Sequence, residues 1–426
     1  MRIVTLISGL GPGGTERAAE NYSTGCRAAG ADVIVLANRG GQREEALQKA
    51  GVPVLIAAGA DWERAIRTVE DWNPDIIHVH RHSATPESTA ILRRLHGARR
   101  RIIETNVFAR FDSSPVGRLI DVSLQLSRWC LCKWARWSSN SPDRPVGVVL
   151  PYAIDCSKFA PLTPAQRLVA RQAYNLPQGA FVFGRIGQPV DTKWSPAMLT
   201  AFGKMAAKHS EVYLLLVGMP ASLTRTLNSL PGEIQRRVIT VPFVYGDSSL
   251  RMCYGAMDCF LHVAQQGESF GYVLCEAMLC GLPVITVSRP SKDNSQVEIV
   301  GHMCGGLVAA AARDLGNAME LLLSNGDLRC KLAASAPDWV RSRFDMAEVI
   351  PQLLRICEIS LECDSRPRIS RLLEAEGFVT KAEWGDLRRT LNNCIGRSSK
   401  LDLLISKVAH MPAVYRQYRV LRETLR

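Results

Sequence analysis

Several features are missing from this sequence of 426 residues, and each absence narrows the class of protein. No apolar run approaches the roughly 18 residues that a membrane-spanning helix needs, which argues against an integral membrane protein. The thirteen cysteines include no Cys-x-x-Cys pair, and the opening residues MRIVTLIS show neither a basic leader nor a small-residue cleavage site. We therefore expect reduced cysteines and a cytoplasmic protein. No Asp-x-Asp triplet is present, so an obvious carboxylate pair for a divalent metal is lacking.

The composition is that of an ordinary globular protein with more basic than acidic residues. Hydrophobic residues make up 47% and charged residues 22% of the chain, a balance that excludes large-scale disorder. The length exceeds what one hydrophobic core usually supports, so we expect two domains. A net charge of +12 favours a polyanionic partner, which can be a phosphate-bearing ligand, an anionic bilayer or a nucleic acid.

Strand-like apolar runs alternate with helix-like segments along most of the chain. Before Pro151 these runs are RIVTLI, ADVIVLA, VPVLIA, PDIIHVH, RRIIE and VGVVL, and after it they are FVFGRIG, VYLLLVG, VITV, MDCFLHV and LPVITV. The alternation predicts an α/β protein with two Rossmann-like, doubly wound parallel sheets. Ligands of open parallel sheets bind at the carboxyl ends of the strands, so we expect a site in a cleft between the domains. The expected divisions are an N-terminal domain 1–155, a C-terminal domain 156–345, a return helix 346–362 and an appended basic helical tail 363–426.

The first strand is followed by GLGPGG at residues 9–14, which has the spacing of a dinucleotide-binding turn. A dinucleotide site also needs an acidic residue at the end of the second strand, and that strand ends in Asn38 and Arg39. Gly13 and Gly14 precede a helical segment for which Thr15 is a candidate N-cap. Backbone N–H groups there can face a phosphate or a sugar. A nicotinamide nucleotide site and a glycine turn without a ligand remain the alternatives.

Two glutamates in QGESFGYVLCEAMLCGLPVITV, Glu268 and Glu276, are separated by seven residues. An apolar helical run begins between them, so residues 269–273 can present N–H groups to a diphosphate at a helix N-terminus. The two carboxylates can then accept hydrogen bonds from a sugar and a ribose. Arg185 and Lys193 follow the strand FVFG, where two cations can neutralise a departing diphosphate. The alternative is that all four side chains are solvated charges.

Taken in order, these motifs resemble the retaining nucleotide-sugar glycosyltransferases of the two-Rossmann GT-B architecture, family 4. The resemblance covers roughly the first 360 residues. The motifs that carry it are GPGGTER, PDIIHVHRH, VLPYAIDCSKFAP, Arg185 with Lys193, and ESFGYVLCEAMLCGLPVI. It implies catalytic residues Glu268, Arg185, Lys193 and His80, donor-binding residues Gly13, Gly14, Ser269, Phe270, Gly271, Tyr272 and Glu276, and sugar or acceptor contacts at Glu16, Glu104 and Asn106.

The resemblance also implies an activity. The expected enzyme moves a hexosyl group from a UDP-sugar or GDP-sugar to a glycan or lipid-linked acceptor with retention of configuration, in polysaccharide or lipopolysaccharide biosynthesis. It needs no cofactor and no metal ion, binds no nucleic acid, and contacts at most the surface of an anionic membrane. The first domain would receive the acceptor and the second the donor. The alternatives are a catalytically silent GT-B protein that binds a glycan or a partner, and a sugar-nucleotide epimerase.

Two departures from the family pattern concern the site. Seven residues separate Arg185 from Lys193, more than is usual in the family. Near the strand end IIETNVF many members carry a histidine, whereas this chain has Asn106 with Glu104 close by. Contacts to the sugar are therefore expected to differ.

Two further stretches allow a structural and a functional interpretation. His78, His80 and His82 alternate in HVHRH and share a strand face, which is compatible with zinc. Because a fourth ligand is lacking, we instead expect His78 in the core and His80 in the cleft. The stretch VSLQLSRWCLCKWARW places three tryptophans and three cations at nearly helical spacing. We expect a helix whose tryptophans pack on the first sheet, with an interfacial helix facing a lipid-linked acceptor as the alternative.

Overall fold

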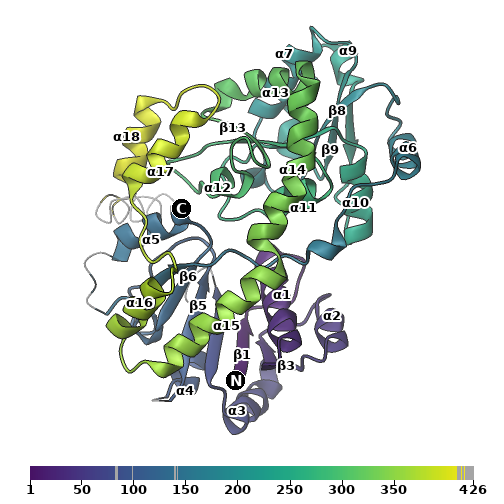
Figure 1. The fold of residues 1–426 in the computed structure, drawn as a ribbon. Coiled ribbons are helices and arrows are strands. Elements are labelled where there is room, and N and C mark those ends of the chain that lie inside the picture. Colours follow the sequence, from purple (N-terminus) through teal and green to yellow (C-terminus); the bar gives the residue numbers. More distant parts are fainter. Residues whose placement is uncertain are drawn as a thin grey trace. The chain divides into compact units, whose positions relative to one another are not determined.

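The computed structural model describes residues 1–81, 85–97, 99–138, 141 and 143–409, together with Val414 and Gln417. The described chain divides into two compact units, coloured along the sequence in Figure 1. Unit 1 holds residues 1–155 and 343–384, and unit 2 holds residues 156–342 and 385–409.

Unit 1 is built on a seven-stranded parallel sheet with the order β3-β2-β1-β4-β5-β6-β7. The strand order changes direction between β1 and β4, which is where open α/β sheets bind ligands. Alternate apolar side chains such as Val4, Ile77 and Ile102 are completely buried beneath the helices. The strands are β1 (Arg2–Ile7), β2 (Asp32–Ala37), β3 (Val54–Ile56), β4 (Ile76–Arg81), β5 (Arg101–Asn106), β6 (Val122–Gln125) and β7 (Val146–Val149).

The helices of unit 1 come from both ends of the chain. A Cβ on Gly25 of α1 would lie 2.6 Å from Cγ1 of Ile350 on α15, so these two helices approach closely only because glycine stands there. Trp129 and Trp134 of α5 are buried, and Trp134 packs against Gly147 of β7, which confirms the expected packing of this helix on the first sheet. The helices are α1 (Gly14–Ala28), α2 (Glu44–Lys49), α3 (Trp62–Trp72), α4 (Pro86–Leu95), α5 (Arg128–Ser138), α15 (Met346–Glu362) and α16 (Arg366–Ala375), with 3₁₀ turns η1 (Gly59–Asp61) and η2 (Gly117–Leu119).

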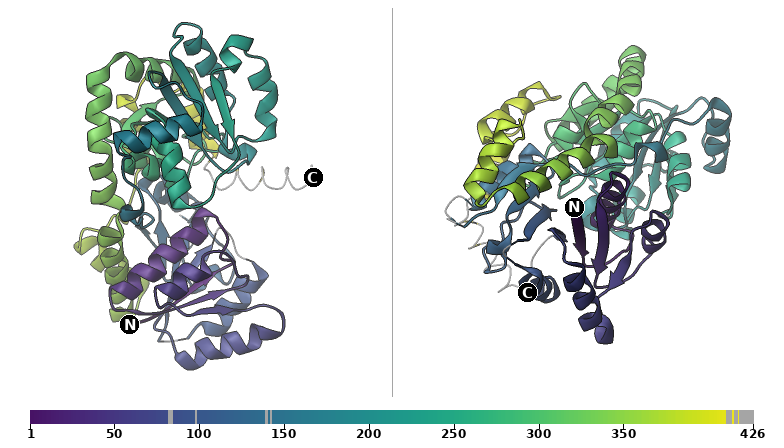
Figure 2. Two further views of the ribbon diagram at one scale, coloured as in Figure 1. Left: turned by 90° about the vertical axis from the view of Figure 1, so that its right-hand side faces the viewer. Right: turned by 60° about the horizontal axis from the view of Figure 1, so that its bottom comes forward.

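Unit 2 repeats the plan with a six-stranded parallel sheet of order β10-β9-β8-β11-β12-β13. Its switch point lies between β8 and β11. The largest side chains of its core, among them Trp194, Phe183 and Phe202, are almost entirely buried. Two further views are given in Figure 2, where the strands of this sheet run from teal to green. The strands are β8 (Phe181–Ile186), β9 (Val212–Val217), β10 (Val238–Val241), β11 (Cys259–His262), β12 (Val284–Val287) and β13 (Gly306–Ala309).

Helices and single turns connect the strands of unit 2. The α-helices are α6 (Pro164–Ala173), α7 (Ala197–Ala206), α8 (Thr224–Asn228), α9 (Gly232–Gln235), α10 (Asp247–Gly255), α11 (Tyr272–Leu279), α12 (Gln296–Val300), α13 (Leu315–Ser324) and α14 (Gly326–Phe344). Helix α14 ends two residues beyond the boundary of the unit. The 3₁₀ turns are η3 (Cys156–Lys158), η4 (Asp191–Lys193), η5 (Ala221–Leu223) and η6 (Ala312–Asp314).

The segment after α15 is helical, as expected, but it is more than an appendage. In unit 1, the backbone N–H of Val149 in β7 donates to the carbonyl of Val379, at 2.9 Å. In unit 2, Ile395 forms a parallel bridge with Ala309 of β13 and accepts a hydrogen bond from the N–H of Ala310, at 2.8 Å. The described part of the predicted tail is thus built into both units. Its last elements are α17 (Trp384–Thr390), η7 (Leu391–Asn393) and α18 (Lys400–Ala409).

The predicted α/β class with two parallel sheets is confirmed, whereas two local predictions are wrong and one strand was missed. Residues VSLQ form β6 rather than helix, and β13 was not predicted. Thr15 lies inside the first turn of α1, whose N-cap residue is Gly13. All thirteen cysteines are free. Among the described residues, no helix is both long and apolar enough to cross a membrane.

Candidate active site

Arg185 stands at the carboxyl end of β8, beside the switch point of unit 2. Its side chain is 1% exposed, and its guanidinium lies 5.4 Å from the ring centre of Trp194 and 5.8 Å from that of Phe260. Nη2 donates to the carbonyl oxygen of Lys193 at 2.8 Å, while Nε and Nη1 have no hydrogen-bond partner among the described residues. Burial lowers the pKa of Arg185 to about 10, which still leaves it a cation at neutral pH.

Lys193 reaches the same place although seven residues separate it from Arg185. The 3₁₀ turn η4 ends at Lys193, and the hydrogen bond from Arg185 holds its carbonyl. The ammonium of Lys193 lies 2.7 Å from Oε2 of Glu268, and the Lys193 side chain as a whole is 39% exposed. The unusual spacing is therefore accommodated by a folded loop that keeps both cations near the carboxyl end of β8.

Glu268 is a buried carboxylate with two basic neighbours. Its Oε1 lies 3.3 Å from Nε2 of His262, the last residue of β11, and Nδ1 of His262 lies 3.3 Å from the hydroxyl of Thr286. Burial and the Arg185 guanidinium lower the pKa of His262 to about 4, so this histidine is neutral at neutral pH. Burial alone would raise the pKa of Glu268, but Lys193 and His262 outweigh it and hold that pKa well below its usual range. Glu268 is thus ionised, with one oxygen on a cation and one on a neutral imidazole.

The loop that carries Glu268 has a fixed backbone. Gly267 has φ of +69°, and a Cβ on it would lie 1.7 Å from the carbonyl oxygen of Asp293. The N–H of Glu268 donates to Oε1 of Gln296 at 3.0 Å, and its carbonyl accepts from the N–H of Ser295 at 3.0 Å. Both bonds lead to the start of α12. The carboxylate therefore projects from a loop that is held on its two sides.

Helix α11 begins directly after that loop. Gly271, with φ of +94°, is its N-cap residue and supplies no capping side chain. Ser269, Phe270 and Tyr272 are buried around this helix start. Glu276, one turn further along, is 3% exposed and accepts a hydrogen bond from the hydroxyl of Tyr254 at 2.8 Å.

In unit 1, the glycine-rich loop is tied to neighbouring elements. Arg43 donates from Nε to the carbonyl of Gly11 at 2.9 Å and forms an ion pair with Glu20 of α1. A Cβ on Gly13 would lie 2.1 Å from Oε2 of Glu16, so the Glu16 carboxylate folds back over the start of α1. Gly14, the first helical residue, is exposed. An anion at this helix start would meet the Glu16 carboxylate and would have to displace it.

The histidines of β4 are both buried. His78 lies 2.7 Å from the hydroxyl of Thr105, and burial lowers the pKa of His78 to about 3. Burial and the neighbouring His78 lower the pKa of His80 well below its usual value. His80 lines a small pocket with Ser8 and Asn38, at the carboxyl ends of β1, β2 and β4. Its ring nitrogens have no hydrogen-bond partner among the described residues.

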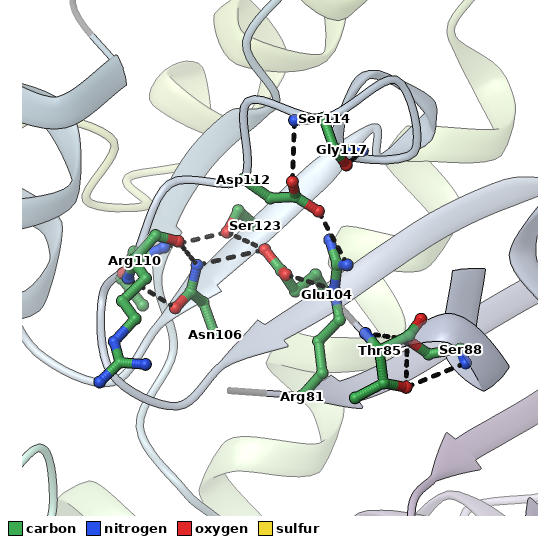
Figure 3. A network of polar contacts seen from close by, with 11 residues as sticks. Arg81, Thr85, Ser88, Glu104, Asn106, Arg110, Asp112, Ser114, Gly117 and Ser123 are labelled. Carbon is green, nitrogen blue, oxygen red and sulfur yellow. Dashed lines mark hydrogen bonds and ion pairs between the residues drawn. The ribbon is translucent and has the colours of Figure 1, made fainter. Parts of the chain in front are cut away.

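Arg81, beside His80, anchors a buried polar network that is shown in Figure 3. Its Nε lies 2.8 Å from Glu104 and its Nη1 lies 2.9 Å from Asp112. Glu104 also accepts hydrogen bonds from Ser123 at 2.9 Å and from Asn106 at 3.2 Å. Asn106 further donates to the carbonyl of Arg110 and accepts from its N–H. The polar atoms of Glu104 and Asn106 are thus engaged within unit 1.

The predicted site residues fall into two groups. Unit 2 brings together Arg185, Lys193 and Glu268, with Glu276 on the adjoining helix. Gly13, Gly14, Glu16, His80, Glu104 and Asn106 belong to unit 1, and their roles, like those of the unit 2 residues, stay predictions. Sequence reasoning missed His262 and Tyr254, which contact the two glutamates. Among the described residues, no three His, Cys, Asp or Glu side chains are placed to hold a metal ion, and His82 lies outside them.

Comparison with known families agrees with this architecture. A family model described as "Glycosyl transferases group 1" matches residues 178–325, and one described as "Glycosyl transferase 4-like domain" matches residues 13–143. The first match lies in unit 2 and the second in unit 1, and together they cover more than half of the chain. The protein is a glycosyltransferase of the GT-B architecture. It belongs to glycosyltransferase family 4.

Individual relatives are distant. A D-inositol 3-phosphate glycosyltransferase from Stackebrandtia nassauensis is 28% identical over 50% of this chain, a match that spans 48%, about half, of that relative's length. A phosphatidyl-myo-inositol mannosyltransferase from Mycobacterium leprae is 25% identical over 72% of this chain and 79% of its own. The crystal structure of HepE from Anabaena in complex with UDP-glucose superposes with a TM-score of 0.68 at 18% identity, covering 84% of this chain and 99% of that one.

Proposed function

We propose that the protein transfers a hexosyl group from a nucleoside diphosphate sugar to a glycan or lipid-linked acceptor, with retention of the anomeric configuration. The observation that carries the proposal is the cluster of Arg185, Lys193 and ionised Glu268 at the switch point of unit 2, beside the start of α11. Membership in family 4 supports the class of reaction. The relatives, a D-inositol 3-phosphate glycosyltransferase and a phosphatidyl-myo-inositol mannosyltransferase, favour an acceptor that carries phosphate or lipid and a role in polysaccharide or glycolipid assembly.

In the proposed reaction, an acceptor hydroxyl oxygen forms a bond to the anomeric carbon while the bond from that carbon to the diphosphate oxygen breaks. The acceptor proton passes to the departing diphosphate on the same face of the sugar. Negative charge therefore grows on the diphosphate, and positive charge grows on the sugar ring. Arg185, through its unpartnered Nε and Nη1, and Lys193 stabilise the first charge without a metal ion. The Glu268 carboxylate orients the sugar and stabilises the second.

The proposal also gives roles to the other predicted residues. Glu276 binds the ribose hydroxyls of a UDP-sugar or GDP-sugar, and Tyr254 fixes its orientation. The N–H groups of Ser269–Tyr272 face the diphosphate at the start of α11. Neutral His80 in unit 1 donates a hydrogen bond to the sugar. Gly13 and Gly14 allow close approach of the backbone, and Glu16 contacts the sugar or the acceptor. Glu104 and Asn106 are proposed for the same contacts, which would replace hydrogen bonds that they make within unit 1.

The two glutamates provide the test. A ribose contact contributes equally to ground and transition states, so Glu276→Gln should mainly weaken donor binding. The loss of one charge-assisted hydrogen bond costs about 1.5–3 kcal/mol, or roughly tenfold to a hundredfold. Glu268 acts where charge develops, so Glu268→Gln should lower kcat more than it raises the donor KM. Release of UDP or GDP from each accepted donor is measured in the presence of EDTA.

Glu233→Gln is the matched control, because this glutamate is exposed on α9 of the same unit. It should behave like the wild type, and circular dichroism checks that all three variants are folded. Near wild-type kinetics for both Glu268→Gln and Glu276→Gln would show that this site does not carry transfer. Activity that disappears in EDTA and returns only with Mg²⁺ or Mn²⁺ would contradict the role given to the two cations.

A further inference from the structure

Helix α18 of unit 2 presents an apolar stripe to the outside. Leu401, Leu404, Ile405 and Val408 are 63%, 58%, 43% and 37% exposed. Their spacing of three, four and seven residues from Leu401 places them on one side of the helix. Most apolar residues that the structure describes lie in the two cores. Four exposed apolar residues on one side of a single helix therefore form a distinct apolar patch. We call these four residues the α18 stripe; the helix is yellow in Figure 1.

The orientation of α18 is inverted relative to an ordinary surface helix. Ser406, on the other side, is completely buried. The helix start is fixed by Ser399, whose hydroxyl accepts hydrogen bonds from the N–H groups of Leu401 and Asp402 at 3.2 and 3.4 Å. The preceding segment is anchored to the sheet of unit 2 through Ile395. These contacts hold α18 with Ser406 buried and with Leu401 and Leu404 exposed.

Basic side chains lie beside the stripe, although the acidic Asp402 is also part of the first turn of α18. Lys400 and Lys407, within α18, and Arg397, just before it, are exposed. Residues 385–426 contain nine Lys and Arg against three acidic residues. An apolar stripe flanked by cations has the chemistry of a helix that lies in the interface of an anionic bilayer.

We propose that the α18 stripe docks this protein on the surface of an anionic lipid membrane, with its leucines among the acyl chains and its lysines on the lipid phosphates. A second copy of the chain fits this surface less well, because two segments with the same basic excess would repel each other. The proposal does not depend on the transfer reaction, since binding to vesicles requires neither donor nor acceptor. It does deepen the proposed function by placing the enzyme where a lipid-linked acceptor would be.

Co-sedimentation of the full-length protein with vesicles tests the docking surface. The wild type should bind vesicles that contain phosphatidylglycerol, bind pure phosphatidylcholine vesicles weakly, and be released by salt. Leu404→Glu with Ile405→Glu should weaken binding by about tenfold or more, because two buried apolar side chains are lost from the interface. Lys400→Gln with Lys407→Gln should weaken it by several fold and reduce its dependence on salt.

Leu168→Glu with Val169→Glu is the matched control. These residues are 43% and 55% exposed on α6, also in unit 2, and this double variant should bind vesicles nearly as well as the wild type, apart from a small electrostatic loss that is removed by salt. The proposal is overturned if the wild type does not bind anionic vesicles, or if the α6 and α18 variants lose binding equally. It is also overturned if sedimentation velocity shows a wild-type dimer that the α18 variant converts to monomers, since the stripe would then belong to a second copy.

Discussion

At the scale of single residues, the site of unit 2 combines two buried charges, Arg185 and Glu268, with the partly exposed Lys193. Arg185 and Lys193 bring two positive charges, and Glu268 brings one negative charge. The sum is positive, which suits a diphosphate, but one of the two cations is already paired. Arg185 is therefore the cation with unpartnered donors, while Lys193 would be shared between Glu268 and the diphosphate. In the proposed reaction, this network would couple the orientation of the sugar to the charge on the leaving group.

His262 gives this network a measurable pH dependence. Burial lowers its pKa from about 6.5 to about 4, so between these values the unfolded chain binds a proton that the folded chain does not. The stability of the fold must therefore fall as the pH falls through this window, by up to about 1.4 kcal/mol per pH unit and roughly 3 kcal/mol in all. His78, with its pKa lowered to about 3, adds a loss of the same sign in unit 1.

We predict that His262→Gln reduces the slope of unfolding free energy against pH by about 1.4 kcal/mol per unit within that window. Glutamine can replace both hydrogen bonds of the imidazole but does not titrate. Urea denaturation at a series of pH values measures the slope, and His209→Gln, a half-buried histidine of the same unit, is the comparison. A slope unchanged in His262→Gln would show that this side chain titrates normally in the folded protein.

At the scale of elements, the loop between β11 and α11 decides where Glu268 points. Its shape depends on Gly267, whose positive φ and close contact with the Asp293 carbonyl leave no room for a side chain. The hydrogen bonds of Glu268 to Gln296 and Ser295 then connect the loop to α12. The position of the Glu268 carboxylate therefore depends on the backbone conformation of this loop.

We predict that Gly267→Ala destabilises unit 2 by about 2 kcal/mol or more and sharply lowers kcat. The added Cβ meets a backbone oxygen in a strained conformation, and relief of the clash must move Glu268 away from Lys193. Gly179→Ala is the control, because Gly179 precedes β8 with no atom within 4 Å of its added Cβ. Thermal unfolding and steady-state kinetics are compared for both variants. Equal effects at the two glycines would refute the strain argument.

Elements with a strong local signal could be predicted from the sequence, whereas those defined by tertiary contacts could not. Eleven apolar runs predicted strands that the structure contains. Strand β6 was missed because Ser123 and Gln125 are polar, and their burial is explained only by the network around Glu104. Strand β13 was missed because GLVA begins with glycine and ends with alanine, two residues of low strand propensity.

The site residues also fall into those that the sequence predicts and those that only the structure shows. The motifs themselves identified Arg185, Lys193 and the two glutamates as candidates. The contact between Lys193 and Glu268 joins residues 75 positions apart in the sequence, so no local sequence pattern predicts it. His262 and Tyr254 look like core residues of β11 and α10 in the sequence. Their role becomes visible only when the glutamates they contact have been placed.

At the scale of the whole molecule, the end of the chain is shared between the two units. Residues 343–384 complete unit 1, and residues 385–409 return to unit 2 and pair with β13. Ile369 and Leu373 are buried in unit 1, and Leu387 and Leu391 are buried in unit 2. The described part of the predicted tail therefore contains two parts of different kind, a structural part up to about residue 398 and helix α18 with its exposed stripe.

Two truncations separate these parts. Ending the chain after Cys363 removes the four buried side chains of α16, α17 and η7, which together contribute roughly 6–12 kcal/mol, comparable to the whole stability of a domain. We predict that the protein truncated after Cys363 is insoluble or unfolded.

Ending the chain after Ser398 removes apolar residues of α18 that are already exposed, so the melting temperature should change by only a few degrees and donor binding should persist. Circular dichroism melts and calorimetry with UDP and GDP make the comparison. A stable, donor-binding protein that ends at Cys363 would show that residues 364–426 are dispensable for folding, and an unfolded protein that ends at Ser398 would show that residues 399–426 are needed for it.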